Sequence, residues 1–166
     1  SGYLGTGTMS VASNATAKTT ADQINALKAE TGVTATARSE VRLGGMASAG
    51  SYSLTLEGDN VASPRTISFT LVAGTGTDRL SPAVSAINEQ AAKTGINASL
   101  NSDGTQIILT NATGNNIVIG DTVNANAGAV TVTGYDAAGA SNGATQTLAA
   151  DANVEFINTG GYITLD

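Results

Sequence analysis

Apolar and polar residues alternate in several short runs, and this pattern predicts β-strands. The runs 52–56 and 66–71 alternate strictly, so each places its apolar side chains on a single face. The turn signal Gly58-Asp59-Asn60 lies between them and predicts that the two strands pair antiparallel. Further strands are predicted at 41–43, 106–110, 117–119, 130–133 and 162–165, and residues 9–12 form a weaker apolar stretch. Residues 134–150 are poor in bulky side chains, which predicts an exposed loop.

Only two segments have the pattern of a helix, at about 21–30 and 82–93. Thr20 and Gln23 have the spacing of a capping box at the start of the first. Ser81 is placed to cap the second, where Pro82 suits the first helical position. A Thr-Gly pair follows each segment and predicts the end of the helix.

The two predicted helices belong to an internal repeat with a constant offset of 63 residues. An Ile-Asn pair in the helix is followed by Thr-Gly, a β-branched residue, one further residue and Ala. The first copy consists of Ile24, Asn25, Thr31, Gly32, Val33 and Ala35, and the second of Ile87, Asn88, Thr94, Gly95, Ile96 and Ala98. The repeat predicts two related units in which a short helix packs on a sheet and a left-handed glycine leads into a strand.

Asn25 and Asn88 occupy the same position of the repeat, which allows two interpretations. One is a contact with a partner, and the other is a hydrogen bond from the side chain to the backbone near the helix-to-strand turn. We favour the second, because short amide side chains bond readily to nearby backbone groups.

These patterns together predict an α+β fold, mostly antiparallel β, with two short helices packed on sheets in two related β/α units. One unit is expected near residues 1–48 and the other near 49–120. Residues 121–166 are expected to add C-terminal strands that return toward the N-terminus.

Composition narrows the possible chemistry. The 166 residues include no His and no Cys, so the usual zinc and haem sites and the Ser-His-Asp and Cys-His catalytic groups are excluded. No catalytic residue, metal site or cofactor is predicted. The net charge of −6, with only 7 scattered basic residues, argues against nucleic acid and anionic membrane surfaces as partners. Apolar runs are far shorter than the roughly 20 residues that cross a bilayer.

The repeated pattern resembles the hook IN motif of bacterial flagellar proteins. This motif occurs in the variable outer region of flagellins, in the filament cap protein and in hook-associated proteins. The resemblance implies a non-enzymatic, secreted filament protein that serves motility and presents an antigenic surface. It also implies an outer region of a longer chain, with other flagellin subunits, host receptors or antibodies, and O-linked glycans as partners. The outer part of a cap or hook-associated protein is the alternative within the same family.

A third hypothesis, from another class, is a glycan-binding adhesin domain. It predicts a surface groove in which at least one tyrosine is exposed beside Asp or Asn side chains. The candidates are Tyr3, Tyr52, Tyr135 and Tyr162.

Overall fold

The structure is a computed structural model that describes residues 2–166, and its fold is the α+β class that the sequence predicts. The helices are α1 (Ala17–Ala26), α2 (Lys28–Thr31), α3 (Ser81–Glu89) and α4 (Ala91–Thr94). The strands are β1 (Ala35–Gly45), β2 (Gly50–Glu57), β3 (Arg65–Leu71), β4 (Ile96–Leu100), β5 (Ile107–Asn111), β6 (Ile117–Asp121), β7 (Val130–Tyr135), β8 (Gln146–Leu148), β9 (Phe156–Thr159) and β10 (Tyr162–Leu165). No helix within residues 2–166 is long and apolar enough to span a membrane.

The strands form two antiparallel sheets. The larger sheet has the order β4-β5-β1-β7-β8, with β10 paired to the first part of β1. The smaller sheet has the order β3-β2-β6-β9. The predicted antiparallel pairing of 52–56 with 66–71 is confirmed by β2 and β3, in which Leu54 lies opposite Ile67.

The alternating strands place their apolar side chains in one core between the sheets, which α3 joins through Ala83 and Ile87. Tyr52 stacks on Phe69 in this core, with ring centroids 5.4 Å apart. Its hydroxyl donates a hydrogen bond of 2.9 Å to the carbonyl of Ser48. With 1% of its surface exposed, Tyr52 is not available to bind a sugar, so that part of the adhesin hypothesis is wrong.

Helix α1 begins earlier than the sequence pattern predicts. Its N-cap is Thr16, whose hydroxyl accepts a hydrogen bond of 3.1 Å from the Thr19 amide, whereas Thr20 lies inside the helix. The predicted capping box is therefore wrong. Helix α3 begins at Ser81, and its N-cap Leu80 makes no side-chain capping hydrogen bond, so the expected cap at Ser81 is also wrong.

Two short strands have no clear alternation and were not predicted. Strand β8 lies inside the segment expected to be a loop, and its Leu148 is buried in the core. Strand β9 carries an exposed Phe156, which lies opposite Gly120 of β6. A Cβ atom on Gly120 would come within 2.5 Å of the Phe156 ring, so the ring covers the backbone that this glycine leaves bare.

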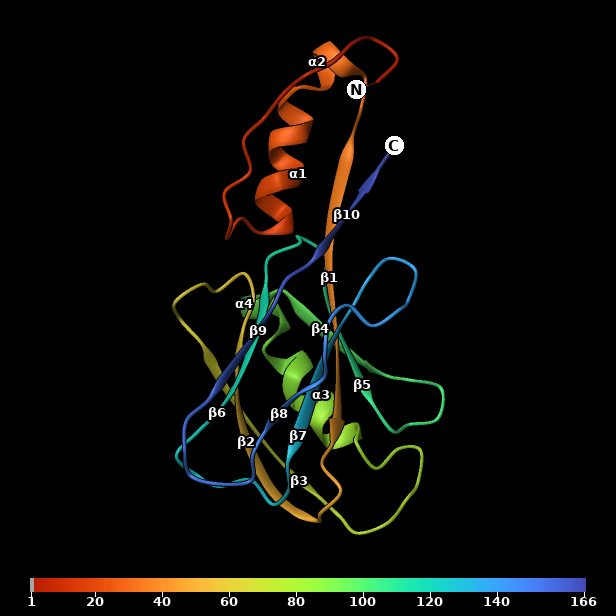
Figure 1. Cartoon of the computed structure of the whole chain (residues 1–166). Coiled ribbons are helices and arrows are strands. Elements are labelled where there is room, and N and C mark those ends of the chain that lie inside the picture. The colour runs from red at the N-terminus through yellow and green to blue at the C-terminus, as the bar shows by residue number, and fades with distance from the viewer. Residues whose placement is uncertain (1) are drawn as a thin grey trace.

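The first repeat copy forms a tip that projects from the rest of the molecule (Figure 1). The tip contains residues 2–34, the start of β1 and strand β10. The backbones of Thr34 and Asp166 exchange two hydrogen bonds of 2.9 Å, and the Leu4 amide donates to the Thr31 carbonyl. Both ends of the described chain therefore lie together at this tip.

Candidate functional site: the duplicated helix-to-strand connection

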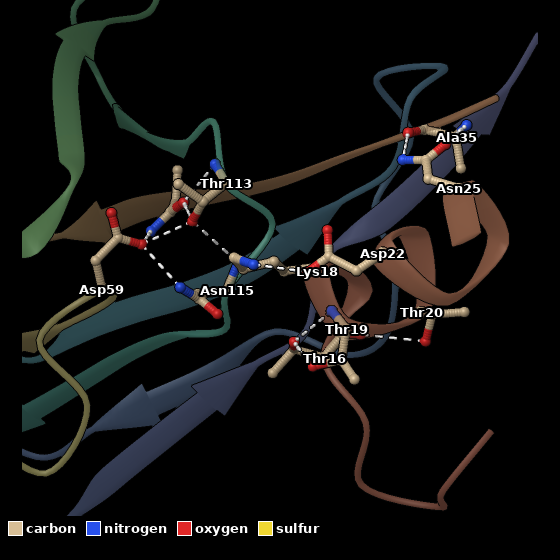
Figure 2. Close-up of polar contacts among 11 residues, drawn as sticks. Thr16, Lys18, Thr19, Thr20, Asp22, Asn25, Ala35, Asp59, Thr113 and Asn115 are labelled. Atoms are coloured by element: carbon tan, nitrogen blue, oxygen red, sulfur yellow. Dashed lines mark hydrogen bonds and ion pairs between the residues drawn. The ribbon is translucent and has the colours of Figure 1, made fainter.

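An asparagine side chain connects helix to strand in the first copy. The Asn25 amide nitrogen donates a hydrogen bond of 2.8 Å to the Ala35 carbonyl, and the Asn25 side-chain oxygen accepts one of 2.8 Å from the Ala35 amide (Figure 2). The side chain thus pairs with Ala35 as a neighbouring strand would. This is the type of backbone hydrogen bond that we favoured from the sequence.

The turn between Asn25 and Ala35 is fixed by a second set of contacts. The Thr31 hydroxyl donates to the Leu27 carbonyl at 3.0 Å and accepts from the Val33 amide at 3.2 Å. Gly32 has φ of 73° and donates its amide to the Lys28 carbonyl at 2.7 Å. The left-handed glycine ends the helix, and the threonine satisfies polar groups on both sides of it.

The second copy repeats these contacts one for one. Asn88 pairs with Ala98 through hydrogen bonds of 3.0 and 2.8 Å. The Thr94 hydroxyl donates to the Gln90 carbonyl at 3.1 Å and accepts from the Ile96 amide at 3.2 Å. Gly95 has φ of 68°. The repeat in the sequence is thus a repeat of a hydrogen-bonding scheme.

Strand pairing repeats as well. In the second copy Ala98 lies opposite Leu109 of β5, and in the first copy Ala35 lies opposite Leu165 of β10. Strand β10 therefore takes the place beside the first copy that β5 takes beside the second.

The two copies differ in what covers them. Ile87 and Ile96 are completely buried in the core, whereas their counterparts Ile24 and Val33 remain partly exposed. Helix α3 packs on both β3 and β4, whereas α1 packs on β1 and β10. Beside α1 lies a cavity of about 220 Å³ whose apolar lining includes Met9, Ile24, Leu27, Val33 and Leu165.

Each left-handed glycine is covered by a different segment. A Cβ atom on Gly32 would come within 2.4 Å of the Tyr3 ring, and one on Gly95 within 2.0 Å of the Asp59 carboxylate. A side chain at either position would therefore meet both an unfavourable φ and a steric clash.

Asp59 connects the second copy to the turn after β5. Its Oδ1 atom accepts hydrogen bonds from Asn111 at 3.0 Å, Thr113 at 2.7 Å and Asn115 at 2.9 Å (Figure 2). The Asp59 amide donates to the Thr94 carbonyl at 2.8 Å. Through its carboxylate and its backbone amide, Asp59 thereby joins the β2–β3 connection to the turn 111–116 and to the helix-to-strand turn.

The same turn holds the first copy. The Lys18 amide of α1 donates to the Gly114 carbonyl at 3.1 Å, and the buried Ser39 hydroxyl donates to the Asn115 carbonyl at 2.7 Å. A Cβ atom on Gly114 would lie 2.3 Å from that of Ala37, so α1 and β1 both pack closely on this turn. The Asp59 cluster, which consists of Asp59, Asn111, Thr113 and Asn115, thus lies where the two copies meet.

The electrostatics of Asp59 follow from these contacts. Partial burial of the carboxylate acts to raise its pKa. The three hydrogen bonds and the positive charge of Lys18 act in the opposite direction and outweigh burial, so the pKa of Asp59 lies below its ordinary value of 3.8.

The structure divides the twelve repeat residues between two places and does not gather them into one cleft. Their polar groups are used in bonding to the backbone, so their role in this arrangement is to shape the chain. No group of three His, Cys, Asp or Glu side chains within residues 2–166 is arranged to hold a metal ion. The Asp59 cluster was not predicted, since its partners are more than 50 residues away in sequence.

The comparisons with known proteins agree with the duplication. Residues 1–49 and 53–113 each match the sequence profile of the flagellin hook IN motif. Each stretch contains one copy of the asparagine-bridged turn, and together they cover more than half of the chain. A comparison with individual curated proteins gives no match.

We expect Asn25→Ala and Asn88→Ala each to lower the free energy of unfolding by about 1–3 kcal/mol, because each removes two hydrogen bonds between the helix and the following strand. Urea denaturation measures this change. Asn97→Ala is the matched control, because Asn97 is exposed on β4. A similarly small loss of stability at all three positions would contradict the role given to the hydrogen bonds from Asn25 and Asn88 to the following strand.

The unequal covering of the copies predicts unequal sensitivity at equivalent positions. Ile87→Ala should lower the free energy of unfolding by about 2–5 kcal/mol, because it leaves a cavity in the core. Ile24→Ala should lower the free energy of unfolding by about 1 kcal/mol, because the partly exposed Ile24 side chain buries less apolar area than Ile87 does. Equal losses in thermal or urea denaturation would show that the tip is as well packed as the core.

The low pKa of Asp59 predicts a loss of stability in acid. A carboxylate whose pKa is lower in the folded state stabilises the fold above its ordinary pKa, and this contribution is lost as the pH falls through the folded-state value. Asp59→Asn should therefore lower stability at neutral pH and reduce the further loss between about pH 5 and pH 2. Urea midpoints measured across this range provide the test. Glu89→Gln, at an exposed carboxylate of α3, is the control and should leave the urea midpoint at neutral pH unchanged.

Proposed function

The chain belongs to the flagellin hook IN motif family, and on this premise we propose that it is the surface-exposed outer domain of a flagellin. The family consists of flagellin-related components of the bacterial flagellar filament, which lies outside the cell. The observation that carries the proposal is the pair of asparagine-bridged turns within the matched stretches. Their side chains are bonded to the backbone of their own turns, which supports a structural role for these residues.

The position of the chain ends supports this proposal. Any flanking chain would join the domain at the tip formed by the first copy (Figure 1). The body, with its two sheets, would then extend away from the filament. The domain would be attached at one end and surrounded by solvent elsewhere.

The distribution of exposed apolar residues supports the same orientation. Five of the ten exposed large apolar side chains within residues 2–166 belong to the tip, namely Tyr3, Leu4, Met9, Val11 and Leu165, and the other five are distributed over loops and strand β9 of the body. Such a concentration of apolar surface is typical of a contact region. In the proposed arrangement the tip packs against the rest of the filament, including neighbouring protofilaments.

The solvent face of the smaller sheet has a different character. The cross-strand pairs Ser51 with Thr70, Ser53 with Ser68, and Thr55 with Thr66 cover the outer side of β2 and β3 with hydroxyl groups. In the proposed role this face and the loops around it are the surface that antibodies and host receptors contact. Its exposed hydroxyl groups are also suitable acceptors for O-linked sugars.

Immunogold labelling with antibodies raised against this chain tests the proposal on intact filaments. We expect labelling along the whole filament. Labelling confined to the distal end would identify a cap protein, and labelling confined to the junction with the hook would identify a hook-associated protein. Absence of labelling from intact filaments, with labelling of dissociated subunits, would show that the domain is not on the surface.

A further inference from the structure

The loop 136–145, between β7 and β8, contains the single Asn-Gly sequence of the chain, Asn142-Gly143. We infer that Asn142 is a site of spontaneous deamidation, with water as the only co-reactant. This inference goes beyond the proposed function and does not depend on it, because the reaction requires only the folded chain.

The reaction uses atoms of two adjacent residues. The backbone nitrogen of Gly143 forms a bond to the side-chain carbonyl carbon of Asn142, and the bond from that carbon to the amide nitrogen breaks. Ammonia leaves, carrying the proton of the attacking nitrogen, and a five-membered succinimide ring remains. Water then adds to one of the two ring carbonyls and opens the ring to aspartate or isoaspartate. Each event replaces a neutral amide with a carboxylate and needs no oxidant or reductant.

The attacking nitrogen is available in this structure. The Gly143 amide donates no hydrogen bond to any other group within residues 2–166. Asn142 and Gly143 are both exposed. Gly143 has φ of 98°, and a Cβ atom placed on it would have nothing within 4 Å. The missing side chain and the open space remove the steric obstacle that other residues after asparagine present to ring closure.

The target side chain is also available. The backbone amide of Asn142 is anchored by a hydrogen bond of 2.7 Å to the Gly134 carbonyl, but its side chain makes no hydrogen bond within the described part of the chain. By contrast, the side chains of Asn25, Asn88 and Asn126 are bonded to backbone groups of other segments. The position of Asn142 is thus fixed from one side only, which leaves its amide group to rotate toward Gly143.

The chain contains one chemically related pair, Asp103-Gly104, which could form the same ring. In this pair, both the attacking amide and the carboxylate are held by hydrogen bonds. The Gly104 amide donates to the Asn101 carbonyl at 3.1 Å, and the Asp103 carboxylate accepts hydrogen bonds from the Thr105 amide and hydroxyl. Gly104 is buried, and a Cβ atom on it would lie 2.0 Å from the Thr77 carbonyl oxygen. Because of this contrast, ring formation should favour Asn142-Gly143 over Asp103-Gly104.

The test is incubation of the folded chain in mildly alkaline buffer, followed by anion-exchange chromatography, intact mass measurement and peptide mapping. We expect a product with one additional negative charge and a mass higher by about one dalton, because an amide NH₂ becomes a hydroxyl. The map should place aspartate and isoaspartate at position 142.

Two variants make the result decisive. Asn142→Gln should abolish the acidic product, because the longer side chain does not form the five-membered ring. Asn124→Gln is the matched control, because Asn124 is exposed in a loop but precedes Ala125, and it should leave the product unchanged. Circular dichroism of each variant confirms the fold. No acidic product from the wild-type chain, its persistence in Asn142→Gln, or modification mapped mainly to Asn124 or Asp103 would overturn the inference.

Discussion

The bridge from an asparagine side chain to both polar groups of a single strand residue is the interaction on which both copies depend. Within the described residues, no backbone hydrogen bond joins helix α1 to strand β1 or helix α3 to strand β4, so their relative position depends on the turn between them and on side chains. Asn25 and Asn88 supply the side-chain contribution by bonding to Ala35 and Ala98 as a paired strand would. The alanine is small enough for this approach, and the Thr-Gly pair brings the chain back at the required angle.

The two copies share this bridge but obtain their stability differently. The second copy lies in the core formed by both sheets, and Ile87 has no exposed surface there. The first copy packs on the ribbon formed by β1 and β10 and on the turn 111–116, which also binds the Asp59 carboxylate. Local hydrogen bonding therefore defines the shape of each copy, whereas long-range packing determines how much free energy each contributes. This division is typical of repeats that share a local sequence but have different neighbours.

Much of the fold could be predicted because its signals are local. Strict alternation located β2 and β3, and the constant spacing of the repeat located both helix-to-strand turns. The start of α1 could not be read correctly, because Thr16 and Thr20 are both of a residue type that caps helices, and the contact at the start of the helix, from the Lys18 amide to the Gly114 carbonyl, is distant in sequence. The Asp59 cluster and strands β8 and β9 depend on residues distant in sequence, for which a single chain carries no pattern.

Strand β1 belongs to both parts of the molecule. Its first residues pair with β10 in the tip, and its later residues are bonded on one side to β5 and on the other to β7. A force that pulls the body away from the tip would act along this strand and would load the hydrogen bonds on both its sides in shear, so that many must break together. A domain held at one end in moving liquid meets this kind of load. Because β1 runs without a break through the tip and the body, the hydrogen bonds along it resist the separation of these two parts together, with no disulfide between them.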